Sequence, residues 1–144
     1  MTASNGFWEF TAGGYGIGKN ATPTGSLGDC IADTGTTLLY LPSNVVTAYY
    51  NRVASASYNS AQGGYVYSCA ATLPDFSLVI GGRTFVVPGA DVAYSPIGGS
   101  QCFGGIQANT GIGFNILGDI FLKSAFVVFD QSQASPRIGF ANKA

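Results

Sequence analysis

The chain has 144 residues, of which 47% are hydrophobic and only 9% are charged, against about a quarter in an average protein. This composition predicts one folded domain over residues 1–144, and the net charge of -1 excludes a basic surface for nucleic acid or for an anionic membrane. Histidine is absent, which removes the usual general base and the commonest metal ligand. Any chemistry must therefore rest on carboxylates, hydroxyls and backbone, and neither a metal nor a cofactor is expected.

Short apolar segments separated by glycine and proline turns predict an all-β fold. Residues 7–10 are rich in aromatic side chains and favour a first strand that ends at Gly13-Gly14. Residues 31–32 form a strand that meets a turn at residues 33–35, and residues 36–41 resume a β-rich run. The order of these segments predicts a loop embedded between two buried strands.

One short helix is predicted after this loop. Ser43 is a suitable N-cap, and apolar side chains recur at helical spacing from Val45 to Val53, so that the helix runs through Arg52. Further strands are predicted at residues 64–69, 76–80, 84–87, 91–94, 102–106, 125–130 and 137–140. The pair at residues 76–80 and 84–87, joined across residues 81–83, is typical of a hairpin.

Several features suit a secreted, extracellular protein in an acidic setting. Three cysteines, Cys30, Cys69 and Cys102, allow one disulfide and leave one thiol over. The chain also has few ionisable groups, whereas a protein with many Asp and Glu residues would lose charge pairs as these protonate in acid. No apolar run reaches the ~18 residues of a membrane span, and residues 1–6 lack the regions of a secretion signal, which indicates a mature or truncated chain. Asn20-Ala21-Thr22 is a candidate glycosylation triplet, although Pro23 reduces its use and such triplets also arise by chance.

The strongest chemical signal is the segment Asp33-Thr34-Gly35-Thr36-Thr37, which lies between two apolar pairs. Burial favours the protonated form of the Asp33 carboxyl, whereas hydrogen bonds from the Gly35 amide and the Thr36 hydroxyl favour the charged form. Gly35 lacks a Cβ, so it allows close approach of backbone to the carboxylate and φ values closed to other residues. An ordinary β-turn is the alternative interpretation, because a D-[ST]-G triplet arises by chance in several per cent of such chains.

Other segments accompany this triplet in a fixed order. Ile116-Leu117-Gly118-Asp119 is an apolar-apolar-Gly element, and residues 7–8, 102–106 and 138–141 are further distinctive segments. Together with residues 31–37 they resemble the pepsin-like aspartic proteases, and within them the C-terminal lobe of secreted fungal enzymes. The resemblance covers nearly the whole chain.

The resemblance implies an all-β lobe that pairs with an N-terminal lobe, each lobe supplying one aspartate to an endopeptidase acting at acid pH. One carboxyl activates water as general base while the other polarises the peptide carbonyl as acid, and no covalent acyl-enzyme forms. Asp33 would be the C-lobe aspartate, with Gly35 and Thr36 as its hydrogen-bonding support. The Thr34 hydroxyl would reach across to the partner lobe, and hydrophobic residues would flank the scissile bond of a peptide or protein substrate.

The resemblance also implies roles for residues outside the loop. Cys69 and Cys102 stand where such lobes carry their disulfide, which leaves Cys30 as a buried thiol or, alternatively, as an intermolecular or engineered disulfide partner. Some positions resemble those that line substrate subsites, with core packing as the alternative for each. These positions are Thr37, Tyr40, Phe103, Ile112, Phe114 and Ile116.

The chain departs from the family pattern because it holds no second D-[ST]-G triplet and no N-terminal lobe with its flap tyrosine. Residues 15–18 superficially resemble a flap tip but precede the aspartate loop, so they are rejected as one. Asp119 is interpreted as a structural residue. The chain is therefore predicted to be half an enzyme: an excised lobe, one chain of a two-chain enzyme, or a lobe that self-pairs. As a monomer it is expected to be inactive.

The missing lobe would leave an apolar face uncovered, with Ile31, Thr34, Leu38 and Ile116 beneath or beside it. A homodimer is the expected response, and it would bring the two copies of Asp33 together. Competing classes are a non-catalytic pepsin-like binding or inhibitor module, an isolated folding unit, and an unrelated all-β barrel that holds a small apolar ligand.

Overall fold

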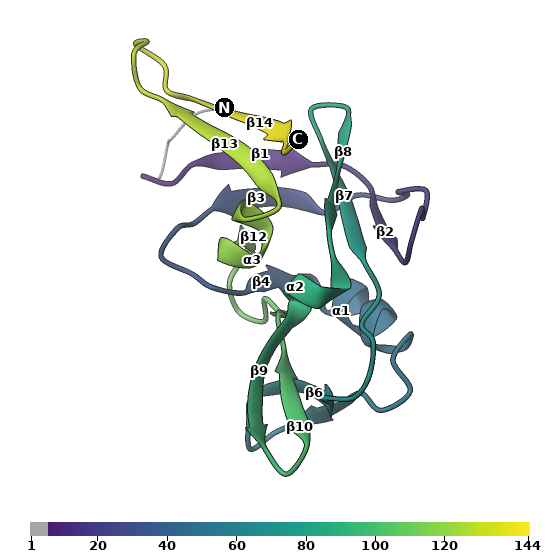
Figure 1. The fold of residues 1–144 in the computed structure, drawn as a ribbon. Helices are drawn as coiled ribbons and strands as arrows, with labels where there is room; N and C mark the ends of the chain where they lie inside the picture. The colour runs from purple at the N-terminus through teal and green to yellow at the C-terminus, as the bar shows by residue number, and fades with distance from the viewer. Residues whose placement is uncertain (1–5) are drawn as a thin grey trace.

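The computed structural model describes residues 6–144, which form four β-sheets and three short helices (Figure 1). The strands are β1 (Glu9–Ala12), β2 (Tyr15–Ile17), β3 (Gly28–Ala32), β4 (Leu39–Leu41), β5 (Ser57–Asn59), β6 (Gly64–Ser68), β7 (Phe76–Ile80), β8 (Arg83–Val87), β9 (Ala93–Gly98), β10 (Gln101–Gly104), β11 (Ile106–Ala108), β12 (Asn115–Leu117), β13 (Ala125–Asp130) and β14 (Arg137–Asn142). The helices are α1 (Ser43–Tyr50), α2 (Gly89–Val92) and α3 (Asp119–Leu122). The predicted all-β class is confirmed.

A five-stranded sheet in the order β1-β3-β12-β4-β11 positions the aspartate loop. Strand β12 lies between β3 and β4, parallel to the first and antiparallel to the second. Leu117 at the end of β12 is paired with both Ala32 and Leu39, so residues 33–38 leave and re-enter the sheet beside the same residue. The predicted loop between two buried strands is therefore present. It connects β3 to β4, and β12 lies between these two strands in the sheet.

The remaining strands form three smaller sheets around this one. The four-stranded sheet β5-β6-β10-β9 extends to one end of the molecule, and the hairpin β13–β14 projects from the other end beside β1 (Figure 1). The three-stranded sheet β2-β7-β8 packs close to β1. The core between these layers is apolar, and its largest fully buried side chains include Tyr49, Phe76, Phe85 and Phe121.

The number and bounds of the helices differ from the sequence prediction. Helix α1 ends at Tyr50, and its N-cap is Pro42, whose carbonyl accepts hydrogen bonds from the Val45 and Val46 amides. Ser43 is thus the first helical residue and does not cap the helix. Two helices were missed, α2, which overlaps the start of a predicted strand, and α3 after β12.

Helix α2 replaces the first half of the strand predicted at residues 91–94. Pro88 precedes the helix with a φ of -59°, and the Asp75 carboxylate accepts the Gly89 amide hydrogen at 2.9 Å. This carboxylate satisfies a donor that the helix cannot satisfy itself. The start of α2 is therefore stabilised partly by Asp75, which is 14 residues away in the sequence and which no local pattern around Gly89 could indicate.

Two other strand predictions need different corrections. The predicted hairpin is confirmed as β7–β8, with a two-residue turn at Gly81 and Gly82, whose φ angles are 58° and 75°, and with β8 beginning at Arg83. Positive φ at both turn positions matches the twist of the flanking strands. The strand predicted at residues 102–106 is two strands, because Gly105 carries the chain from the four-stranded sheet to the five-stranded sheet.

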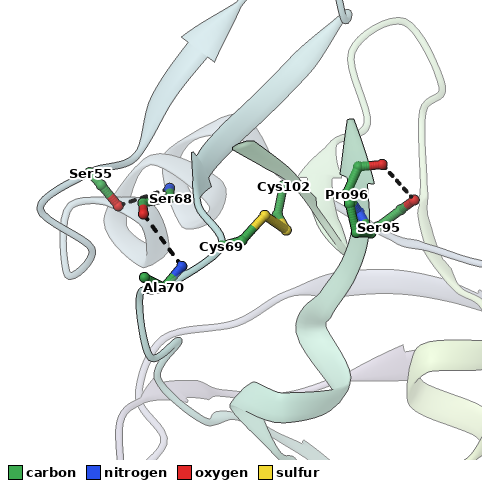
Figure 2. Close-up of a disulfide and its surroundings, with 7 residues drawn as sticks. All are labelled: Ser55, Ser68, Cys69, Ala70, Ser95, Pro96 and Cys102. Carbon is green, nitrogen blue, oxygen red and sulfur yellow. Dashed lines mark hydrogen bonds between the residues drawn. A yellow bond between two sulfur atoms is a disulfide. The ribbon is translucent and has the colours of Figure 1, made fainter. Parts of the chain in front are cut away.

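The cysteine pairing implied by the resemblance is confirmed. Cys69 and Cys102 form a disulfide that joins the end of β6 to β10 (Figure 2). Cys30 is a free and fully buried thiol on β3. Loss of hydration raises the pKa of the Cys30 thiol to about 11, so the thiol stays protonated and unreactive at neutral pH.

We expect the double substitution Cys69→Ser and Cys102→Ser to lower the free energy of unfolding by about 3 to 4 kcal/mol. The disulfide closes a loop with a sequence separation of 33, which restricts the unfolded chain. Urea unfolding under oxidising conditions measures the change, with Cys30→Ser as the single-cysteine control. A loss below about 1 kcal/mol would contradict the expected role of the bridge.

No helix among residues 6–144 is long and apolar enough to cross a membrane. The sequence interpretation of residues 1–6 as lacking a secretion signal falls mainly on residues 1–5, which lie outside the described residues.

Candidate active site

The loop at residues 33–38 is fixed by backbone hydrogen bonds to the last residue of β12 and to the two residues that follow it. The Asp33 amide donates to the Leu117 carbonyl at 3.2 Å, where β3 ends. In the other direction, the Gly118 amide donates to the Leu38 carbonyl at 3.2 Å, and the Asp119 amide donates to the Thr36 carbonyl at 2.8 Å. The apolar-apolar-Gly element therefore lies directly against the aspartate loop and holds both of its ends.

Both oxygens of the Asp33 carboxylate accept a hydrogen bond from the loop itself. The Gly35 amide donates to Oδ1 at 2.9 Å, and the Thr36 hydroxyl donates to Oδ2 at 2.6 Å. These are the two bonds expected from the sequence. They fix the orientation of the carboxylate and compensate for the hydration that it loses on partial burial.

Gly35 is required at its position for one of the two reasons expected. A Cβ at Gly35 would lie 3.2 Å from Asp33 Oδ1, so a side chain would crowd the carboxylate. Its φ angle is not in the left-handed region, and the expectation of an unusual φ is wrong. Close approach of backbone to the carboxylate accounts for the glycine.

The Asp33 carboxylate borders an open cavity of about 300 Å³. Asp33 is half-buried, whereas Thr34 and Gly35 are exposed. The lining residues are Gly6, Phe7, Trp8, Ala32, Asp33, Thr34 and Phe129. The aromatic residues come from both ends of the chain, and the rings of Trp8 and Phe129 pack edge to face with centroids 5.2 Å apart. An open cavity that combines three aromatic side chains with one oriented carboxylate has the mixed lining typical of a ligand site.

The six predicted subsite positions do not line this cavity. Tyr40 and Ile116 are half-buried and lie directly opposite each other on β4 and β12. Phe114 lies next to the cavity lining, because its ring contacts the cavity residue Phe7 with ring centroids 5.9 Å apart. Ile112 is half-buried in the preceding loop and Thr37 is exposed. Their roles toward substrate stay predictions.

Phe103 lies in a different part of the fold. It is on β10 in the four-stranded sheet, is half-buried and packs against the core, where its ring closes the space beside Gly64. This environment favours the packing alternative for Phe103, and its place at a subsite also stays a prediction.

Phe7 and Phe129 are cavity residues whose roles the sequence interpretation missed. The aromatic character of residues 7–8 was noted only as a feature of the family, and Phe129 only as part of an apolar strand. The aromatic character of Phe7 and Phe129 was the only sequence signal for a cavity role. No local sequence pattern shows that these two residues, so far apart in the chain, lie at the same cavity.

The cavity contains only one carboxylate among the described residues, that of Asp33. Asp119 is exposed as the first residue of α3, and its contribution to the loop is its backbone amide. Within residues 6–144, no group of three or more His, Cys, Asp or Glu side chains could hold a metal ion. The arrangement can accept and donate a proton at one carboxyl group and lacks a second group to share it.

The sequence of this loop and its supporting segments places the chain in a known family. Residues 1–143 match the family described as eukaryotic aspartyl protease. The chain belongs to the eukaryotic aspartyl proteases. This aspartyl protease chain is 55% identical over 141 residues to aspergillopepsin-1 of Aspergillus pseudoglaucus and 50% identical over 145 residues to endothiapepsin of Cryphonectria parasitica.

The aspartyl protease chain spans about a third of the length of these curated relatives. The match covers 98% of the chain but 35% of aspergillopepsin-1, and 99% of the chain but 34% of endothiapepsin. Penicillopepsin-2 of Penicillium janthinellum is similar, with 54% identity over 100% of the chain and 36% of the relative. The resemblance stated from the sequence is confirmed at the level of the family.

Proposed function

We propose that the chain is the C-terminal lobe of an aspartic endopeptidase and that Asp33 is one of its two catalytic aspartates. The observation that carries the proposal is the Asp33 carboxylate, held by two donors at 2.9 and 2.6 Å beside an open cavity that contains no other carboxylate among the described residues. A single carboxyl group cannot share a proton with itself. A second lobe must supply the other.

In the proposed enzyme, the two carboxyl groups hold one proton between them. The ionised carboxyl removes a proton from a bound water, whose oxygen attacks the peptide carbonyl carbon, while the protonated carboxyl donates its proton to the carbonyl oxygen. The tetrahedral intermediate then collapses with proton transfer to the leaving nitrogen, which breaks the C–N bond. In this chain, the Gly35 amide and the Thr36 hydroxyl keep the Asp33 oxygens in place during these transfers.

Exposed apolar side chains on β13 support a partner lobe. Phe126 and Val128 lie on one face of this strand and are 61% and 48% exposed. On the opposite face of the strand, Phe129 packs on Trp8 at the cavity beside Asp33. Phe129 and Phe7, which line this cavity, are themselves 38% and 48% exposed. Exposed apolar residues at a functional cavity are typical of a protein interface. We infer that the partner lobe contacts these two side chains and completes the cavity.

The four residues expected beneath or beside an uncovered face differ in exposure, and their part in such a face stays a prediction. Ile31 and Leu38 are buried in the chain itself, so they contribute little to an exposed face. Thr34 is exposed and Ile116 is half-buried, which leaves both accessible beside the loop. The residues that do expose large apolar area near the site are on β13 and at Phe7.

An intact carboxylate geometry favours an enzyme over a non-catalytic binding or inhibitor module. A protein that only binds does not need a loop that aims two donors at one carboxylate. We also propose that the chain is secreted, because its disulfide forms and persists in an oxidising compartment.

A chimaera tests the proposed function. The chain replaces the segment of aspergillopepsin-1 that it matches, and the product is assayed for cleavage of an unfolded protein at acid pH. We expect endopeptidase activity in this chimaera and none in either part alone. A correctly folded chimaera that binds substrate peptide without cleaving it would favour the binding module instead.

The homodimer remains a separate proposal for the isolated chain. Thr34 is exposed at the loop, so in a twofold dimer its hydroxyl can reach the second copy beside the two Asp33 residues. We expect sedimentation at acid pH to detect a dimer that Thr34→Ala weakens by roughly 2 kcal/mol, because twofold symmetry removes two hydrogen bonds of about 1 kcal/mol each. A chain that stays monomeric at its highest soluble concentration, or a dimer unaffected by Thr34→Ala, would contradict this pairing.

A further inference from the structure

The segment between β2 and β3 presents Asn20 at the tip of a closed loop. Tyr15 and Thr24 exchange two backbone hydrogen bonds of 2.9 Å each, which close the loop of residues 16–23. Within it, the Ala21 amide donates to the Gly18 carbonyl at 3.3 Å and forms a tight turn with Asn20 at its third position. Asn20 has a φ of 57° and is exposed.

The turn by itself explains an asparagine at this position. A positive φ at the third residue of a turn favours Gly or Asn, because other side chains are strained there. The turn ends at Ala21 and does not include Thr22, whose side chain is exposed. Asn20-Ala21-Thr22 has the sequence that the N-glycosylation machinery requires.

A shallow groove of about 570 Å³ lies beside the acceptor side chain. It is lined on one side by the loop and on the other by strands β7 and β8 with the residue preceding β7. Its lining residues include Asn20 and Thr22 on the loop and Asp75, Thr84 and Val86 opposite them. Val86 is 48% exposed, and Thr84 and Asp75 offer polar groups beside it. This combination suits a sugar ring, which has an apolar face and hydroxyls at its rim.

The loop is remote from the aspartate. Strands β1 and β3 are antiparallel, with Ala12 opposite Gly28 and Glu9 opposite Ile31. The loop therefore leaves the sheet at the end where β3 begins, whereas Asp33 follows the end of β3. A group attached at Asn20 would leave the cavity beside Asp33 open.

We propose that Asn20 is an N-glycosylation site and that its first N-acetylglucosamine lies over the groove next to Val86. The proposal rests on the proposed secretion, since the modification takes place on chains that enter the secretory pathway. Pro23 directly follows the triplet and reduces its use, so the wild-type chain is expected to be modified in part.

The test is translation of the chain behind a cleavable secretion leader in the presence of microsomes. This assay does not depend on the fold, because the acceptor is read on the translocated chain, and protection from added protease shows translocation. We expect a second band that a glycosidase for high-mannose glycans removes. Asn20→Asp and Thr22→Ala should abolish this band, Thr22→Ser should keep it, and Pro23→Ala should increase its fraction. Asn20→Asp still tolerates the positive φ.

A translocated wild-type chain with no shifted band would overturn the proposal, whether or not Pro23→Ala restores one. A shifted band that survives Thr22→Ala would overturn it as well. The assay measures the attached glycan and not proteolysis. A failure of the glycosylation proposal can therefore be told apart from a failure of the proposed enzyme function.

Discussion

Replacing Asp33 with Asn in the chimaera is expected to lower kcat by at least about 10³-fold, because an amide can neither accept nor share the catalytic proton. The substitution keeps the size of the side chain, and its oxygen can still accept the bond from Thr36 or Gly35. We therefore expect binding of substrate to change little. The measurement is kcat and KM for a peptide substrate at acid pH, together with urea unfolding of the same protein.

Asp119→Asn is the matched control for this experiment. Asp119 is also in a family segment, but its carboxylate is exposed and outside the cavity, and only its backbone amide supports the loop. We expect kcat to stay within about twofold of the parent, as is usual for a group that touches no reacting atom. Equal losses in the two variants would refute the assignment of Asp33.

Gly118→Ala is expected to destabilise the fold by roughly 3 kcal/mol or more and to abolish activity of the chimaera. A Cβ at Gly118 would collide with the carbonyl oxygens of Thr36 and Leu38, which are backbone atoms of the aspartate loop. The loop can move aside only by breaking the hydrogen bonds that these same carbonyls accept from the Gly118 and Asp119 amides. The substitution must displace the loop that orients Asp33.

Gly139→Ala is the control for Gly118→Ala, because it adds the same methyl group to an exposed strand with only ordinary contact to Val128 at 3.9 Å. Urea unfolding of both variants gives the free energies, and the chimaera gives the activities. If Gly118→Ala were as stable and as active as Gly139→Ala, the supporting role of the element after β12 would be wrong.

The sequence predicted those parts of the fold whose signals are local. The β7–β8 hairpin is an example, because Gly81 and Gly82 alone provide the positive φ angles of its turn. The hydrogen bonds from Gly35 and Thr36 to Asp33 were also predictable, because all three residues lie within one turn of chain.

The features that were missed depend on segments far apart in the sequence. Helix α2 begins at a residue whose amide is satisfied by Asp75, and no pattern near Gly89 reports that contact. The cavity beside Asp33 is built from Phe7, Trp8 and Phe129, which meet only because β13 folds back to the start of the chain. Residue type alone could not separate such cavity residues from core residues.

The most direct test of the central claim is the proteolytic rate of the isolated chain, measured on material that sedimentation shows to be monomeric under the assay conditions. The claim is that the chain supplies one half of a two-aspartate site. It predicts no cleavage of an unfolded protein by the monomer at any pH, and cleavage by the chimaera that depends on Asp33. Hydrolysis by the monomer, at a rate proportional to its concentration and abolished by Asp33→Asn, would contradict the claim.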